Sequence, residues 1–179
     1  MSWPVCYARL SVSIPILTIV LCIIVELRKA RDFDNIFGNP INKFAHKADI
    51  IRLEALLEYG GIYLDLDVYT IRSFAPLLHF DTVLGIEGGV PPMPRQGLCN
   101  GIIVSAANSS FLRRWHEDYK SFRDSDWAGH SVKLPLKLAK SNPDEILVLD
   151  PFAMFYPLCT ELFHESSTRL RDFSLTMVV

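Results

Sequence analysis

The alternation of apolar and polar positions is clearest in the second quarter of the chain. Between Lys47 and Tyr59 the apolar residues recur three and four positions apart, which predicts an amphipathic helix. Gly60 and Gly61 follow directly, and glycine readily adopts the left-handed conformation found at helix ends. Residues 62–67 then read Ile-Tyr-Leu-Asp-Leu-Asp, a run too short for a helix, and we predict a strand there.

The predicted strand at 62–67 carries two carboxylates at its carboxyl end. Residues two apart in an extended segment face the same side, so Asp65 and Asp67 should converge while Leu66 returns to the core. Two adjacent carboxylates repel each other unless a cation lies between them. Mg²⁺ or Mn²⁺ bound by one or two carboxylates keeps coordination positions for water and phosphate oxygens. The pair therefore favours a divalent cation shared with a diphosphate.

The preceding helix carries a second pair of charged residues. Asp49 and Arg52 are three positions apart and so lie on one face of the helix. An arginine fork binds carboxylates and phosphates through parallel hydrogen bonds. Arg52 beside a metal-bound diphosphate is therefore a chemically sensible pairing.

Further along the chain, apolar runs separated by turn residues alternate with helical patterns. One helix should begin at Ser110, with its apolar stripe in the core, and another should follow residue 132. The three prolines of residues 90–97 predict an irregular loop. Buried strands are predicted at residues 81–89, 98–105 and 145–149. Strands and helices thus alternate along the chain, which predicts an α/β fold.

An apolar stretch at residues 10–27 is about long enough to span a bilayer, which takes ~20 residues. We expect a membrane-anchor-like segment over residues 1–31 and a separate catalytic domain over residues 32–179. Three basic residues follow the stretch and one precedes it, which favours a cytoplasmic carboxyl side. The alternative is that the stretch forms a buried strand or helix of the domain itself.

Composition adds little about the substrate. A chain of 179 residues with a net charge of −2 is one domain without the basic surface of a nucleic-acid-binding protein, so we expect no nucleic-acid partner. The four cysteines are widely spaced, which indicates neither a zinc site nor a disulfide framework.

The run from His46 to Val68, H-K-A-D-I-I-R-L-E-A-L-L-E-Y-G-G-I-Y-L-D-L-D-V, resembles the DXD-containing sugar transferases. These include Golgi mannosyltransferases, inositolphosphoceramide mannosyltransferases and bacterial capsular-polysaccharide enzymes. The resemblance extends over about residues 33–160. It implies a GT-A-type fold, in which helices flank a mixed central sheet. It also implies a nucleotide-diphosphate sugar donor, a glycan or glycolipid acceptor and retention of anomeric configuration. It also implies a single-pass type II protein of the Golgi membrane, an orientation that the flanking charges do not support.

The resemblance also implies roles for individual residues. Asp67 ligates Mn²⁺ or Mg²⁺ together with Asp65, and Asp65 also touches the sugar or ribose. Asp49 and Arg52 bind the sugar hydroxyls and the phosphate side. Tyr63 is in register with the same motif and is assigned to the donor site. Asp65, Asp67 and Arg52 are thus the expected catalytic residues.

Three residues outside this run are candidates for donor contacts. Asn100 begins an apolar run that lines the sugar pocket in relatives, and its alternative role is a strand-entry cap. Glu87 lies at the mouth of a predicted strand and is otherwise an edge carboxylate. His130 precedes a helix that lies near the pocket floor in relatives, and it is otherwise a structural histidine. We expect His46, at the start of the first helix, to face solvent.

The resemblance is incomplete at both ends of the chain. Relatives begin with a strand and helix that grip the base, and here only the apolar stretch could replace them. They also carry a late His or Asn with a tryptophan that completes the metal site, which residues 170–179 lack. We therefore expect a shortened fold that transfers a hexose, namely mannose, glucose or galactose.

Two alternative functions stay open. One is a non-catalytic, membrane-anchored remnant of the same family. The other is a haloacid-dehalogenase-like phosphatase, which also places D-x-D after an apolar strand but wants Thr or Val where this chain has Tyr69.

Overall fold

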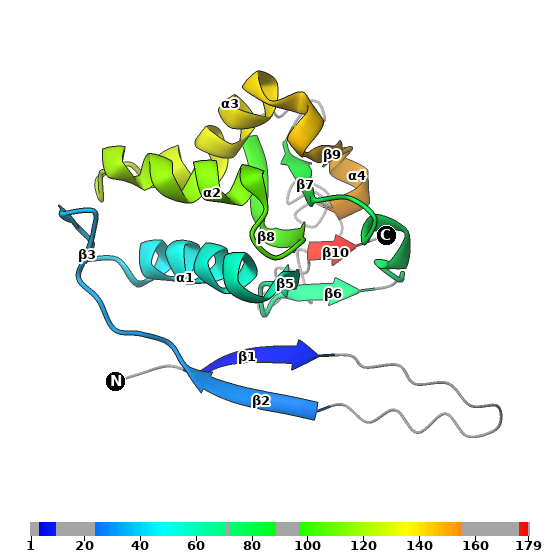
Figure 1. The fold of residues 1–179 in the computed structure, drawn as a ribbon, viewed down its shortest axis with the longest axis horizontal. Coiled ribbons are helices and arrows are strands. Elements are labelled where there is room, and N and C mark those ends of the chain that lie inside the picture. The colour runs from blue at the N-terminus through cyan, green and yellow to red at the C-terminus, as the bar shows by residue number, and fades with distance from the viewer. Residues whose placement is uncertain (1–3, 10–23, 71, 89–96, 155–175, 179) are drawn as a thin grey trace, which may run out of the picture. The chain divides into compact units, whose positions relative to one another are not determined.

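The computed structural model describes residues 4–9, 24–70, 72–88, 97–154 and 176–178. The chain divides into two compact units, residues 1–34 and residues 35–179. In the first unit, strands β1 (Pro4–Arg9) and β2 (Ile24–Lys29) form an antiparallel pair (Figure 1).

The apolar stretch at residues 10–27, the expected membrane anchor, is described only at its end. Residues 24–27 lie in strand β2, and residues 10–23 are outside the described residues. Among the residues that are described, none of the helices has both the length and the apolar character needed to cross a bilayer.

The second unit is built on a four-stranded mixed sheet in the order β5–β8–β7–β9. Strand β8 is antiparallel to both β5 and β7, whereas β9 is parallel to β7. Two short pairs accompany the sheet, β3 with β4 and β6 with β10. The strands are β3 (Asn35–Ile36), β4 (Asn39–Pro40), β5 (Gly61–Leu64), β6 (Val68–Thr70), β7 (Thr82–Glu87), β8 (Gly97–Ser105), β9 (Leu147–Leu149) and β10 (Thr176–Val178).

Helices flank this sheet, as the sequence predicts. Helix α1 packs against α2, α3 packs on α2 and β8, and α4 packs on β7 (Figure 1). Short helical turns join these elements. The helices are α1 (Phe44–Tyr59), α2 (Ser110–Glu117), α3 (Leu134–Ser141) and α4 (Pro151–Met154); the turns are η1 (Ala75–Leu77), η2 (Asp118–Ser121), the π-helical η3 (Gly129–Lys133) and η4 (Pro143–Glu145). The mixed α/β fold is confirmed.

The core agrees with the predicted apolar pattern. On one side of β8, Ile102 and Val104 pack with Phe74, Val83 and Met154. The predicted stripe of the helix at Ser110 is confirmed, because each of its members is at most 4% exposed. Those members are Phe111, Leu112, Trp115, Tyr119 and Phe122.

Leu66 does not return to the core, so that prediction is wrong. Strand β5 ends at Leu64, and residues 65–68 form a tight turn in which the Val68 N–H donates to the Asp65 carbonyl oxygen at 3.1 Å. The turn directs Leu66 into solvent, where its side chain is fully exposed. The extended geometry expected for residues 65–67 is replaced by this turn.

The solvent-facing position expected for His46 is also wrong. His46 is 2% exposed, because the first turn of α1 packs against the segment that follows η2. Its Nδ1 lies 2.8 Å from Asp124 Oδ1, and its ring meets Phe122 edge-on with 5.2 Å between the centroids.

Two other predicted segments fall largely outside the described residues. The loop at residues 90–97 is described only at Gly97, which begins β8. Residues 170–179, which lack the late metal-site motif of relatives, are described only at β10.

Candidate functional site

The end of α1 sets the path of the chain into β5. Gly60 has a φ of 63°, and its N–H donates to the Leu56 carbonyl oxygen at 2.8 Å. A Cβ at Gly60 would lie 2.5 Å from the backbone nitrogen of Ala107, so glycine alone fits this position. The predicted helix end is confirmed. The reversal sets β5 against α1, so that the carboxylate after β5 meets the charged residues of the helix.

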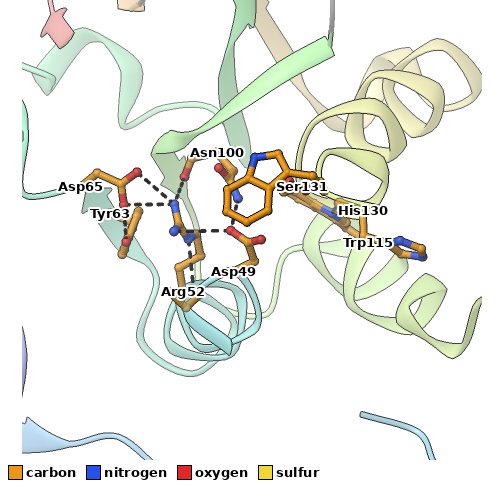
Figure 2. Close-up of polar contacts among 10 residues, drawn as sticks. Asp49, Arg52, Tyr63, Asp65, Asn100, Trp115, His130 and Ser131 are labelled. Carbon is orange, nitrogen blue, oxygen red and sulfur yellow. Dashed lines mark hydrogen bonds and ion pairs between the residues drawn. The ribbon is translucent and has the colours of Figure 1, made fainter. Parts of the chain in front are cut away.

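Arg52 is the centre of a polar cluster (Figure 2). Its Nη1 donates to the Asn100 carbonyl oxygen at 2.8 Å and lies 3.1 Å from Asp65 Oδ1. Its Nη2 lies 3.4 Å from Asp49 Oδ1. The guanidinium also covers the ring of Tyr63, 4.5 Å from the centroid. One buried arginine therefore neutralises two carboxylates, one from the helix and one from the turn.

Asn100 joins β8 to this cluster. Its side-chain Nδ2 donates to Asp49 Oδ1 at 2.7 Å, while its carbonyl oxygen accepts from Arg52. Asn100 is the fourth residue of β8, so it lies inside the strand. The structure thus brings a residue of the third predicted strand to the face of α1.

Asp65 is held by its backbone and by its carboxylate. Its N–H donates to the Gly101 carbonyl oxygen at 2.8 Å, and the Tyr63 hydroxyl donates to Asp65 Oδ1 at 2.6 Å. A Cβ at Gly101 would lie 2.9 Å from Asp65 Oδ2. The Asp65 carboxylate therefore packs against the Cα of Gly101, and any side chain at position 101 would displace it.

Asp67 lies in the exposed turn after Asp65. Among the described residues, no group of three His, Cys, Asp or Glu side chains could hold a metal. A hard cation for which water and phosphate oxygens supply most of the ligands needs only one or two carboxylates from the protein. The Asp65 side chain is 36% exposed and Asp67 is exposed, so carboxylate oxygens of the kind that such an ion prefers are open to solvent at this turn.

Burial and charge set the protonation of the cluster. Burial raises the pKa of Asp49, and Arg52 and Asn100 oppose this shift. Burial disfavours the charged form of Arg52, but Tyr63, Asp65 and Asp49 outweigh it and raise the Arg52 pKa. Burial raises the pKa of Tyr63 as well, with Arg52 opposing, so the hydroxyl keeps the proton that it donates to Asp65.

Glu87 lies outside this hydrogen-bonded cluster. It ends β7, where it pairs with Gly97, and burial raises its pKa. The sequence did not single out Cys99 as part of a site, yet its Sγ lies beside Gly101 and its pKa responds to Glu87 and Asp65. Burial is the main cause that raises the pKa of Cys99 to about 12, so the thiol stays protonated.

His130, in η3, lies beside two aromatic side chains, Tyr119 of η2 and Phe122, which directly follows η2. Its ring centroid lies 5.2 Å from that of Tyr119 and 5.3 Å from that of Phe122, and its Nε2 lies 3.2 Å from Ser121 Oγ. Its carbonyl oxygen accepts from Trp115 Nε1 at 2.7 Å. Burial lowers its pKa. Figure 2 shows the imidazole directed away from the cluster around Arg52, so the structure does not bring His130 into that cluster.

The chain matches a known family over the region that builds this cluster. Residues 21–84 match the family model described as a glycosyltransferase sugar-binding region containing a DXD motif. Over these residues the chain is similar to that family. The matched region includes Asp49 and Arg52 of α1, Tyr63 of β5, and Asp65 and Asp67 of the turn. Asn100 lies beyond it.

Two curated proteins are similar to the chain. Glucan organizing enzyme 1 of Cryptococcus neoformans var. grubii is 45% identical over 130 residues, which are 70% of this chain and 35% of that protein. Inositol phosphoceramide mannosyltransferase 3 of Schizosaccharomyces pombe is 56% identical over 66 residues, which are 37% of this chain and 17% of that protein. The chain therefore spans about a third or less of the curated relatives that it matches. No solved structure matches it.

Proposed function

We propose that the chain is the catalytic domain of a glycosyltransferase of GT-A type. It transfers a hexose from a nucleotide-diphosphate sugar to a hydroxyl of a glycan or glycolipid acceptor, with retention of configuration. The observation that carries the proposal is the convergence of Asp49 and Asp65 on Arg52, which joins the helix to the DXD turn. A buried arginine between two carboxylates is a preorganised charge centre of the kind that stabilises developing negative charge.

The residues divide into two groups by role. Asp67, with Asp65, would hold Mn²⁺ or Mg²⁺, and the cation when bound neutralises charge on the departing diphosphate. Arg52, which is buried, would help to neutralise the same negative charge. Asp49 accepts hydrogen bonds from sugar hydroxyls, and Asn100 and Tyr63 keep the two carboxylates in place. We assign no protein nucleophile.

The donor sugar and the cellular location are proposed from the similarity of the chain to its relatives. Because one relative is a mannosyltransferase, mannose is the first donor sugar to test, with glucose and galactose next. Attachment to the Golgi membrane stays a prediction from the resemblance of the DXD run. Glu87 and His130 stay proposed donor or acceptor contacts that lie outside the Arg52 cluster.

The function is tested by Mn²⁺-dependent hydrolysis of GDP-mannose, UDP-glucose and UDP-galactose by the purified chain. We expect release of the sugar from one of the three donors and loss of that activity in Asp67→Ala. Asp144→Ala, which removes an exposed carboxylate from η4, is the matched control and should retain activity.

The same assay separates the two alternatives. Hydrolysis of p-nitrophenyl phosphate, without hydrolysis of the sugar nucleotides, would identify a phosphatase. Inactivity toward all four compounds would identify a non-catalytic remnant. Either result contradicts the proposed transferase.

A further inference from the structure

The loop between β8 and α2 carries the one Asn-X-Ser/Thr tripeptide of the chain, Asn108-Ser109-Ser110. This tripeptide is the acceptor sequence for N-linked glycans when its middle residue is not proline. A glycan is bulky and hydrophilic, so the asparagine must also lie on the surface with its amide nitrogen accessible. The structure meets both conditions at Asn108.

Asn108 lies on an exposed turn that it forms with Ala107. Its φ of 60° is left-handed, a conformation in which asparagine is several-fold enriched over other residues. The Asn108 N–H donates to the Leu57 carbonyl oxygen at 2.8 Å, which fixes the loop against the end of α1. The fold therefore presents this asparagine on a surface turn with a defined backbone.

The side chain of Asn108 is oriented by one exposed contact. Arg113 Nη1 donates to Asn108 Oδ1 at 2.9 Å. In the part of the chain that the structure describes, Nδ2 of Asn108 has no hydrogen-bond partner. An N-linked glycan is attached at Nδ2, so the atom that must react is left available.

The two serines of the tripeptide differ in what they do for the fold. Ser109 is the buried N-cap of α2, and its Oγ accepts from the Leu112 N–H at 3.4 Å. Ser110 is the first residue of α2, and no described residue pairs with its hydroxyl. The hydroxyl that the acceptor sequence requires is therefore not part of the hydrogen bonding of the fold.

A glycan at Asn108 would not obstruct the Arg52 cluster. Strand β5 begins where Gly61 pairs with Ser105, three residues before Asn108, and it ends directly before Asp65. The four residues of β5 span about 13 Å, so the loop and the turn with the carboxylates lie at opposite ends of the strand.

We propose that Asn108 carries an N-linked glycan and that the unit of residues 35–179 therefore lies in the lumen of the secretory pathway. The donor is a lipid-linked oligosaccharide diphosphate, used by the oligosaccharide-transferring enzyme of the endoplasmic reticulum. Nδ2 forms a bond to the anomeric carbon, the bond from that carbon to the diphosphate oxygen breaks, the amide loses one proton, and the lipid diphosphate leaves. This placement is the one that the resemblance to Golgi enzymes implies and that the charges around the apolar stretch do not support.

The test is expression of the full chain in yeast, followed by electrophoresis before and after digestion with endoglycosidase H. Digestion should increase the mobility of the wild type by a single step. Ser110→Ala should migrate like the digested wild type with or without the enzyme, whereas Ser110→Thr keeps the acceptor sequence and should keep the shift. Wild-type mobility that digestion leaves unchanged would overturn the proposal.

The matched control is Ser141→Ala, which removes the hydroxyl of an exposed serine in α3 that belongs to no acceptor sequence. It should keep the wild-type shift. Alanine has a higher helix propensity than serine, so neither alanine variant should lower the melting temperature, measured by circular dichroism. Loss of the shift in Ser110→Ala alone would then report the missing acceptor hydroxyl. A shift that persists in Ser110→Ala would place the glycan elsewhere and overturn the assignment.

A second measurement locates the glycan. Release by peptide N-glycosidase converts the glycosylated asparagine to aspartate, so mass spectrometry of the peptide should find aspartate at position 108 after release. Unmodified asparagine at this position in the protein from yeast secretory membranes would overturn the proposal. Because the glycan is detected without a sugar-nucleotide donor, failure of the proposed transferase activity would leave this result unaffected.

Discussion

The two halves of the candidate site differ in their exposure. Asp49 and Arg52, on α1, are 8% and 7% exposed, and each has several polar partners inside the protein. The carboxylates of the turn, Asp65 and Asp67, are open to solvent. Arg52 is the side chain that contacts both halves. The site therefore combines a fixed charged pair with an accessible pair of carboxylates.

This difference separates what the fold holds in place from what must arrive from solvent. Buried charges cost desolvation energy, which good partners offset, and so they are oriented before any ligand binds. Exposed carboxylates cost little to keep ionised and can accept a hydrated cation with its phosphate ligands. Changes in the helix half should thus affect stability and binding together, and changes in the turn half should affect chiefly metal-dependent activity.

Arg52→Ala should have the largest effect. It leaves Asp49 as a buried carboxylate without its cation, which should lower the free energy of unfolding by about 3 kcal/mol. Urea unfolding followed by circular dichroism measures this loss, and donor binding should become undetectable. Arg114→Ala removes an exposed arginine paired with Glu145 and should leave donor binding unchanged. Equal stability of Arg52→Ala and the wild type would contradict the fixed character of the helix half.

Gly101→Ala tests whether the position of the Asp65 carboxylate matters for activity. The added Cβ would lie 2.9 Å from Asp65 Oδ2, so the carboxylate must move. Because small displacements of a catalytic group are costly, Mn²⁺-dependent activity should fall by about a hundredfold. In the Asp65→Ala background the same change should cause little further loss. Full activity of Gly101→Ala would show that the position of Asp65 is not critical.

Tyr63→Phe removes one hydrogen bond from the turn half. The hydroxyl donates to Asp65 Oδ1 at 2.6 Å, and a bond to a charged group is worth about 1.5–3 kcal/mol, so activity should fall by roughly ten- to a hundredfold. The measurement is kcat/KM for donor hydrolysis. Tyr69→Phe, at an exposed tyrosine in β6, is the matched control and should behave as the wild type. A similar loss in both variants would argue against a specific role for Tyr63.

Glu87→Gln should have the smallest effect, visible only as a change with pH. Burial raises the pKa of Glu87 in the folded protein, so the folded state binds the proton more tightly than the unfolded state does. Wild-type stability should therefore fall as pH rises from the ordinary pKa of glutamate to the raised value. The glutamine variant should lack this part of the pH dependence in melting temperatures measured at several pH values. Parallel profiles of the two proteins would contradict the shift.

The sequence alone determined the elements whose causes are local. Helical periodicity and Gly60 predict α1 and its end, and alternating apolar runs predict β7 and β8 to within one or two residues. The placement of Asp49 and Arg52 on one face also follows from helix geometry. These features need only contacts between residues that are close in the chain.

Tertiary structure decided the features that depend on distant residues. The turn at residues 65–68 replaced the end of the strand expected at residues 62–67. His46 is buried where it pairs with Asp124, 78 residues away. Asn100 reaches Asp49 across 51 residues, and Gly101 leaves the space that the Asp65 carboxylate fills. Periodicity could not reveal these contacts, because it records which face of an element is apolar and not which partner that face meets. The sequence thus supplied the charged groups of the site, and packing between α1, β5 and β8 decided which of them meet.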